Sequence, residues 1–380
     1  MSDVNSFGFG EEEQMLRDSA AKFFKENMPT DKLHKLVASK PENVGQAQCE
    51  WDRELWQKMV DLGWTMVAIP ERAGGMAMSF AAIVGLVEEV GRAAFPSPLI
   101  STISASCILA ACDSAEADSV LSQIADGKTC SLAVTNQKGS WEAEDSDLVE
   151  EDGVVNGSAW YVQDAQKVDS FVIKARSGSG VGLYLVESDA EGLTLVADNI
   201  TDLTRDQAHL EFDNVSVQSV VADSSSGAEA VSAAVPALLT ILAADMCGAA
   251  EWQLQTTAEY ARVREQFDRP IGFFQAVKHP LVDLMSMIDC ARSHTYNAAS
   301  AISFDPDEAE KSARMAKAAA SDAAAYACSR SLQFHGGIGF TWGCFIHIYF
   351  KRQKHSQMLM GDASYQRAKL ADIIIGSVAA

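Results

Sequence analysis

The sequence predicts an α+β protein of several domains: an N-terminal helical domain, a central domain of antiparallel β strands and a C-terminal four-helix bundle. Apolar residues recur at helical spacing in the first third of the chain, short runs rich in Val, Leu, Phe and Tyr fill the middle, and long helical periodicity returns afterwards. The chain of 380 residues also exceeds the size at which a single core stops growing, about 250 to 300 residues. We expect domains at residues 1–128, 129–226 and 227–380.

The first predicted domain is helical from residue 11 to about residue 125. Met15, Ala20 and Phe23 begin a helical apolar pattern that resumes at Leu55. Proline and paired glycines stop or turn helices, and such breaks fall at Pro29, Gly74-Gly75 and Pro96-Ser97-Pro98.

The central domain is predicted from short apolar runs separated by turn residues. The turn signals are Asp152-Gly153 and Asn156-Gly157, which are typical of hairpins. The expected strands are residues 130–135, 148–155, 159–162, 170–175, 182–186 and 208–215.

The C-terminal domain follows a polar linker at residues 224–227. Its helical segments are long enough for a bundle of antiparallel helices. They are expected at about 229–265, 275–303, 307–334 and 361–376.

Composition excludes several classes of protein. The net charge of -22 would repel a phosphate backbone, so we expect no nucleic acid partner. No uninterrupted apolar run reaches the roughly 18 residues of a membrane span. Residues 1–7 carry no signal or transit pattern, so we expect a cytoplasmic protein.

The cysteines are scattered and form no C-x-x-C pair. Most stand among apolar neighbours, which favours reduced core residues over metal ligands or disulfides, and no metal site is expected. They are Cys49, Cys107, Cys112, Cys130, Cys247, Cys290, Cys328 and Cys344.

A dinucleotide fold of the Rossmann type is not expected. Its glycine-rich fingerprint opens a helix directly after a strand. The nearest match in this chain, Gly336-Gly337-Ile338-Gly339, follows a predicted helix.

Three stretches, in this order, resemble the acyl-CoA dehydrogenase family. The first spans residues 56–99 and includes Leu62-Gly63-Trp64 and Pro96-Ser97-Pro98-Leu99; the second spans 260–279 and includes Arg264-Glu265-Gln266-Phe267; the third is 333–341, with Gly336-Gly337. The resemblance implies the same three-domain fold, an oligomer, and FAD bound at a subunit interface.

The second and third stretches make chemical sense as the adenosine and pyrophosphate half of an FAD site. A guanidinium can neutralise pyrophosphate, and glycines let backbone approach a ligand closely. We expect Arg264 and Gln333 to meet the same FAD from opposite subunits. Considered separately, these residues could also be a helix-end charge, a core aromatic and a helix cap. The expected cofactor residues are Arg264, Phe267, Gln275, Gln333, Gly336 and Gly337.

The flavin-ring side departs from the family pattern. Where the family carries a Thr-Glu-Pro-Gly type of turn, this chain reads Thr135-Asn136-Gln137-Lys138, so Thr135 alone matches. Tyr161 either packs on the flavin or is a buried strand aromatic. Ser364 is assigned to the cofactor on the same resemblance.

The family's catalytic carboxylate, which removes the α proton of an acyl-CoA, is not at its usual positions. Most members place a Glu where this chain has Met360, and a minority where it has Leu238. Two nearby acids remain as candidate bases. Asp362 is either the base or a helix N-cap, and Asp245 is either the base or a buried ion-pair partner.

Three functional interpretations remain open. The first is FAD-dependent oxidation of an acyl-CoA to the 2,3-enoyl-CoA, with electrons passed to an electron-transfer flavoprotein. In the second, the chain is a non-catalytic subunit that completes the FAD interface of a paralogue in a heterotetramer, as in relatives that oxidise pimeloyl-CoA or steroid side chains. In the third, a flavoenzyme with altered chemistry has dispensed with the Glu.

Overall fold

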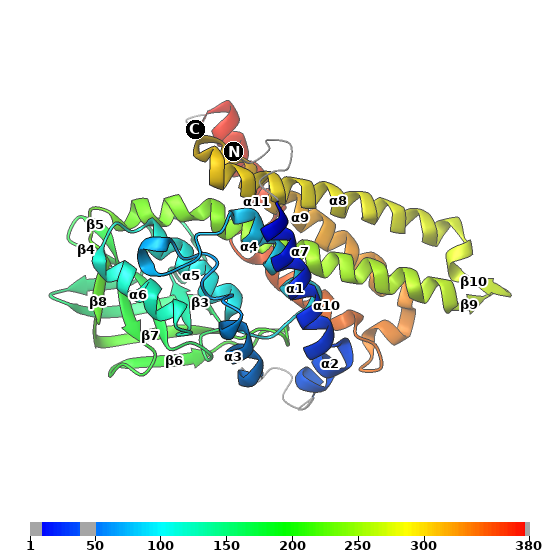
Figure 1. Ribbon diagram of the computed structural model, residues 1–380, viewed down its shortest axis with the longest axis horizontal. Helices are drawn as coiled ribbons and strands as arrows, with labels where there is room; N and C mark the ends of the chain where they lie inside the picture. Colours follow the sequence, from blue (N-terminus) through cyan, green and yellow to red (C-terminus); the bar gives the residue numbers. More distant parts are fainter. Residues whose placement is uncertain (1–9, 39–50, 377–380) are drawn as a thin grey trace.

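The computed structural model describes residues 10–38 and 51–376. Figure 1 shows an elongated molecule, with a β domain at one end, a long helical hairpin at the other and the N-terminal helices across the middle. Cys49, one of the predicted reduced cysteines, lies outside the described residues. The other seven are free, and Cys290 is the exposed one among them.

The N-terminal part is helical, as predicted, and its helices stop at the predicted breaks. Pro29 separates α1 from α2, and the segment with Pro96 and Pro98 separates α4 from α5. The elements are α1 (Glu11–Asn27), α2 (Thr30–Ala38), α3 (Arg53–Asp61), the 3-10 turn η3 (Glu71–Ala73), α4 (Phe80–Ala93), α5 (Leu99–Ala111) and α6 (Ala115–Ala125).

The central domain is one sheet, with β6 and β8 at the ends of its main path. It is mixed, because β1 and β2 pair with β4 in parallel, while the other pairs are antiparallel. The chain reverses direction between β2 and β3 and again between β3 and β4. As a result, β4 runs parallel to β2 and to β1. The strands are β1 (Cys130–Ala133), β2 (Val149–Glu151), β3 (Val154–Gln163), β4 (Ser170–Ser177), β5 (Gly180–Glu187), β6 (Leu193–Ala197), β7 (Gln207–Ser216) and β8 (Ser219–Ala222).

The structure has a hairpin turn at one of the two predicted positions and a continuous strand at the other. Asp152 and Gly153 have φ of 52° and 80° and connect β2 to β3. The prediction for Asn156-Gly157 is wrong, because both residues lie inside β3. The register shifts there against β7, and Gly157 has φ of 119°, so this glycine marks a β-bulge.

The C-terminal part consists of long helices joined by short connections. α7 is apolar and long enough to cross a bilayer, but 83% of its most apolar window is buried inside the fold, as in the core helix of a globular protein. The elements are α7 (Gly227–Val263), β9 (Glu265–Gln266), β10 (Arg269–Pro270), η4 (Ile271–Phe273), α8 (Gln275–Phe304), α9 (Pro306–His335), η5 (Gly336–Phe340), α10 (Ile346–Met358) and α11 (Ala363–Ile375). α10 was not among the predicted segments.

α7 is the central helix of the molecule, because it packs against α4 of the N-terminal part and against α8 and α9 of the C-terminal part. It crosses α4 so closely that a Cβ on Gly248 would lie 1.8 Å from the carbonyl oxygen of Glu88. A Cβ on Gly91 would likewise lie 2.2 Å from the carbonyl oxygen of Asp245. The two glycines therefore allow the two backbones to touch.

Candidate functional site

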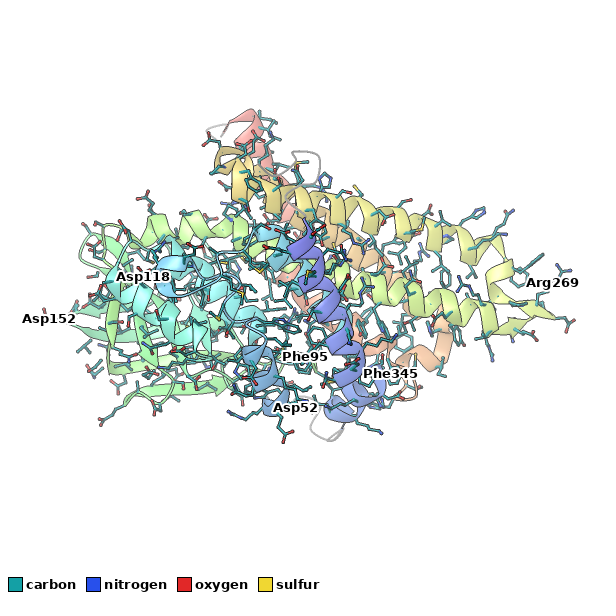
Figure 2. All side chains as sticks on the ribbon, in the orientation of Figure 1. Asp52, Phe95, Asp118, Asp152, Arg269 and Phe345 are labelled. Carbon is teal, nitrogen blue, oxygen red and sulfur yellow. The ribbon has the colours of Figure 1, made fainter. Side chains whose placement is uncertain are left out.

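A cavity of about 80 Å³, called the inner cavity below, lies where the N-terminal helices, the sheet and the C-terminal helices meet. Phe95, which borders it, is labelled near the centre of the molecule in Figure 2. Its apolar wall consists of Phe95, Ile100, Leu132, Trp141, Tyr161, Leu238, Leu242, Leu359 and Met360, and its polar wall of Ser97, Ser101, Ser104, Ser131, Gln163, Asp164, Arg205 and Arg352.

Met360 and Leu238 both line the inner cavity. These are the two positions at which the resemblance places a catalytic Glu, and the structure brings them to one cavity from α7 and from the turn between α10 and α11. Both side chains are apolar and buried. Neither can accept a proton.

The turn that carries Met360 is held from beneath by Lys317 of α9. The Lys317 ammonium is fully buried and donates to the carbonyl oxygens of Gly361 at 2.9 Å and Gln357 at 3.1 Å. Burial lowers the pKa of Lys317 to about 7, against the attraction of the Asp362 carboxylate. Lys317 thus fixes the backbone at the family's catalytic position.

Asp164 is the one carboxylate among the described residues that line the inner cavity. One of its oxygens accepts from the Ser101 hydroxyl at 2.6 Å, and the other accepts from the Lys167 ammonium at 2.7 Å. Both carboxylate oxygens of Asp164 are thus taken up by donors of the protein itself, and this geometry favours an anchoring role.

Asp245 does not border the inner cavity; it lies in a fully buried ion cluster. Its oxygens accept from Arg352 at 2.5 Å, Arg205 at 2.6 Å and the Ser356 hydroxyl at 3.0 Å. Burial alone would raise the pKa of Asp245, but the guanidinium groups of Arg352 and Arg205 hold it below its usual value. These contacts favour the ion-pair interpretation of Asp245 over the base.

Asp362 caps α11. Its side chain accepts from the backbone N–H of Tyr365 at 2.9 Å, and it is not among the residues that line the inner cavity. This arrangement is the N-cap alternative that the sequence left open.

The three residues expected near the flavin ring, Tyr161, Thr135 and Ser364, lie in different environments. Tyr161 lines the inner cavity with φ of 59°, and its hydroxyl donates to the carbonyl of Gln137 at 3.2 Å. Thr135 is buried outside the cavity wall, and Ser364 lies exposed on α11. The structure therefore brings Tyr161 alone of these three to the cavity.

The adenosine-side residues from the second stretch are gathered on the connection between α7 and α8. Arg264 follows the last residue of α7 and is exposed, and Gln275 is the exposed first residue of α8. Phe267 has φ of 53°, is 85% exposed and meets the edge of Phe274 at 6.1 Å between ring centroids.

The third stretch lies at the same end of the molecule. Gln333 is exposed on the last turn of α9, and Gly336 and Gly337 follow it. A Cβ at either glycine would meet no heavy atom within 4 Å. The open backbone leaves room for a ligand.

The expectation that Arg264 and Gln333 meet the same FAD from opposite subunits concerns an assembly of chains and stays a prediction. The Tyr260 ring of α7 stacks on the His335 ring of α9 with centroids 4.3 Å apart, which brings both helix ends together within one chain. Figure 2 shows Arg269, in the α7–α8 connection, at the end of the molecule opposite Asp152 of the β domain. One chain therefore presents its adenosine-side groups at the end of the molecule opposite its β domain.

The adenosine-side groups fit the pyrophosphate and adenosine of FAD. An exposed guanidinium beside the first turn of α8 suits a dianion, since helix N-termini carry unpaired N–H groups and a positive dipole end. The flavin side fits less well, because the Thr135 hydroxyl is enclosed and the Asn136-Gln137-Lys138 segment replaces the family's turn.

Sequence reasoning missed Trp141, Lys317, Arg205 and Arg352. Lys317 left no signal, because lysine is mostly exposed and its burial here depends on the distant carbonyls of Gln357 and Gly361. Trp141 left none, because nothing in the sequence relates its loop to α7 or α11.

Comparison with known proteins gives the family of the chain. The family model for the acyl-CoA dehydrogenase N-terminal domain matches residues 10–128, and that for the C-terminal domain matches residues 227–375. The chain is 32% identical to acyl-CoA dehydrogenase IpdE2 of Mycobacterium tuberculosis over 351 residues, which is 92% of this chain and 93% of that protein. It is 28% identical to acyl-CoA dehydrogenase FadE27 of the same organism, over 84% of this chain and 87% of that one.

Among solved structures, the fold resembles a chain of the ChsE4-ChsE5 complex from Mycobacterium tuberculosis. The TM-score is 0.85 at 26% identity, over 97% of this chain and 99% of that chain.

Proposed function

The chain belongs to the acyl-CoA dehydrogenase family, and from that premise we propose that it is a base-free subunit of a heteromeric acyl-CoA dehydrogenase. In that assembly it completes the FAD site of a paralogous subunit, which supplies the carboxylate. The reaction is oxidation of an acyl-CoA thioester to its 2,3-enoyl-CoA.

One observation carries this proposal. Met360 and Leu238, the two positions at which the resemblance puts the base, line one cavity, and both are apolar. The carboxylate that does border the cavity, Asp164, is held by Ser101 and Lys167. A chain without a free carboxylate beside the acyl group cannot remove an α proton by itself.

The other half of the proposal concerns what this chain retains. Arg264, Phe267, Gln275 and the Gly336-Gly337 turn lie exposed at one end, away from the chain's own cavity. They would bind the pyrophosphate and adenosine of an FAD whose ring lies in the partner's β domain. FAD, when bound there, would supply the hydride acceptor for the reaction, and this chain's residues would hold its pyrophosphate and adenosine.

The relatives support a mixed assembly. The ChsE4-ChsE5 complex contains two differently named chains, and this chain covers nearly the whole of the one it matches. We further propose that the assembly is a cytoplasmic heterotetramer and that an electron-transfer flavoprotein accepts its electrons.

Co-expression with a carboxylate-bearing paralogue tests the proposal. We expect the chain alone to hold little flavin and never to bleach with an acyl-CoA, whereas the co-purified complex holds FAD and reduces it. If the protein purified alone bound one FAD per chain and oxidised an acyl-CoA, it would need no paralogue, and the proposal would be refuted.

A further inference from the structure

A second hollow lies directly beside the inner cavity. This hollow of about 170 Å³, called the vestibule below, is bordered by Trp141 and Met360, which also border the inner cavity. The two side chains are therefore the partition between the hollows. The rest of the vestibule is lined by Glu142, Ala143, Ser232, Val235, Leu239, Glu310, Arg314, Tyr365 and Gln366.

The two hollows differ in chemistry. The inner cavity has an apolar wall of aliphatic and aromatic side chains, whereas the vestibule holds a guanidinium, two carboxylates, a phenol and an amide. Together they suit an elongated ligand with an apolar end and a polar stem, because each part then meets matching groups.

Met360 is the fixed half of the partition. The carbonyl oxygen of Met360 accepts from the Gln366 amide at 2.5 Å, and the neighbouring Gly361 carbonyl accepts from Lys317. Gln366 is in turn held by the Arg314 guanidinium at 2.9 Å. Moving this turn would break several buried hydrogen bonds at once.

Trp141 is the half that can move. It lies between β1 and β2, in a segment without helix or strand, and its side chain is only partly buried against the C-terminal core. Apart from the contacts of Glu142 with β4 and α11, the hydrogen bonds of residues 139–145 join residues of the loop to one another, such as Ser140 to Asp145 at 2.5 Å. A loop of this kind opens at lower cost than a packed helix.

The next residue fastens this loop to α11. The Glu142 carboxylate accepts from the Tyr365 hydroxyl at 2.9 Å and pairs with the Lys369 ammonium. The hydrogen bond from Lys369 holds the pKa of Glu142 below its usual value. On the inner side, Lys174 donates to the Glu142 carbonyl oxygen at 2.6 Å, which anchors the backbone and leaves the side chain as the outer tie.

We propose that Trp141 is a gate between the vestibule and the inner cavity, and that Glu142 is the latch that keeps it closed. An elongated ligand enters from the vestibule when Glu142 releases α11 and the indole swings out. That the ligand is an acyl thioester rests on the proposed function; the gate itself does not.

Thiol labelling of the inner cavity tests the gate without flavin or turnover. Leu242→Cys places a thiol on the buried wall, and its alkylation by N-ethylmaleimide is followed by mass spectrometry of that peptide, separately from the native cysteines. In this background, Glu142→Gln should speed labelling about two- to fivefold, the range expected for losing an exposed ion pair, since the introduced amide oxygen can still accept from Tyr365. Trp141→Ala should speed it further, because the gate itself is gone.

Glu144→Gln is the matched control. Glu144 lies on the same loop, carries the same charge and borders neither hollow, so its replacement should leave labelling unchanged. Equal rates in the Glu142→Gln and Glu144→Gln proteins would overturn the latch, and an unchanged rate in Trp141→Ala would overturn the gate. If Leu242→Cys fails to fold, amide hydrogen exchange of residues 137–147 in Glu142→Gln decides the same question, with faster exchange expected. All these results are independent of whether the chain has its own base.

Discussion

The ring of Tyr260 lies on the ring of His335, with centroids 4.3 Å apart and planes inclined by 19°. Tyr260 is one turn before Arg264, and His335 directly precedes Gly336. This stacked pair therefore fixes the spacing between the cation proposed for pyrophosphate and the glycine turn proposed for adenosine, which the sequence places some 70 residues apart.

Arg264→Ala should release FAD from the assembled complex without unfolding it. Hydrogen bonds to charged groups contribute about 1.5 to 3 kcal/mol, so affinity should fall roughly ten- to a hundredfold. Arg264 is exposed, and its loss should leave the unfolding midpoint nearly unchanged. Flavin absorbance per protein after gel filtration measures this. Arg262→Ala, another exposed arginine at the end of α7, is the control; equal flavin content in the two variants would remove Arg264 from the cofactor site.

Met360→Glu should restore a carboxylate to the inner cavity. We expect its pKa to be raised by burial, and the free energy of unfolding to fall by about 1 to 3 kcal/mol. Met360→Gln has a similar shape and cannot accept the proton. Urea unfolding measures the loss of stability, and flavin bleaching by an acyl-CoA in the co-purified complex measures the gain of activity. If Met360→Glu bleaches no more flavin than Met360→Gln, this chain's own cavity no longer holds substrate beside a flavin.

Asp245→Asn should be strongly destabilising. The change leaves Arg205 and Arg352 buried beside an uncharged amide, and breaking a buried ion pair in this way costs about 3 to 5 kcal/mol. Denaturant unfolding measures the loss. A variant as stable as the parent protein would show that the two arginines find other partners.

Asp362→Asn should change little, since Asn caps a helix as well as Asp does. Asp362→Ala, which removes the cap, should cost about 0.5 to 2 kcal/mol. Flavin reduction by the co-purified complex should be the same in Asp362→Asn and the parent. Loss of reduction with FAD retained would instead identify Asp362 as the base.

The pH dependence of stability should report Lys317. Its pKa is lowered to about 7 in the folded protein, so between that pH and its ordinary value the unfolded chain binds the extra proton. The free energy of unfolding should therefore rise with pH from about 7 to the ordinary pKa of lysine, by up to about 1.4 kcal/mol per pH unit. Lys317→Met should remove that rise, as measured by urea unfolding at pH 7, 8 and 9. Parallel pH profiles for the two proteins would contradict the buried, easily deprotonated lysine.

The long helices and the domain order could be predicted because their signals are local. α7, α8 and α9 each repeat apolar residues over many turns, and Pro29 and Pro98 break the chain by their own chemistry. α10 was missed because its buried face includes Arg352, Gln353 and Ser356, so burial there does not follow apolarity. Asn156-Gly157 was misjudged because the same dipeptide serves a hairpin turn or a bulge, and pairing with β7 decides between them.

The site was predictable only where resemblance fixed individual positions. Met360 and Leu238 were assigned to the place of the base from sequence alone, and both line the inner cavity. The roles of Asp245 and Trp141 depend on partners more than 100 residues away in the chain, Arg352 and Met360. Spacing along the sequence carries no information about such pairs.

The close packing of α4 on α7 also has a consequence for synthesis of the protein. The core that buries Phe24, Trp64 and Phe95 also contains Ile241 of α7 and Ile348 and Tyr349 of α10. A nascent chain emerging from the ribosome must therefore keep its first helices without their full apolar cover until α10 has been translated. A fragment that ends near residue 128 should need a chaperone or aggregate, although its helices form locally.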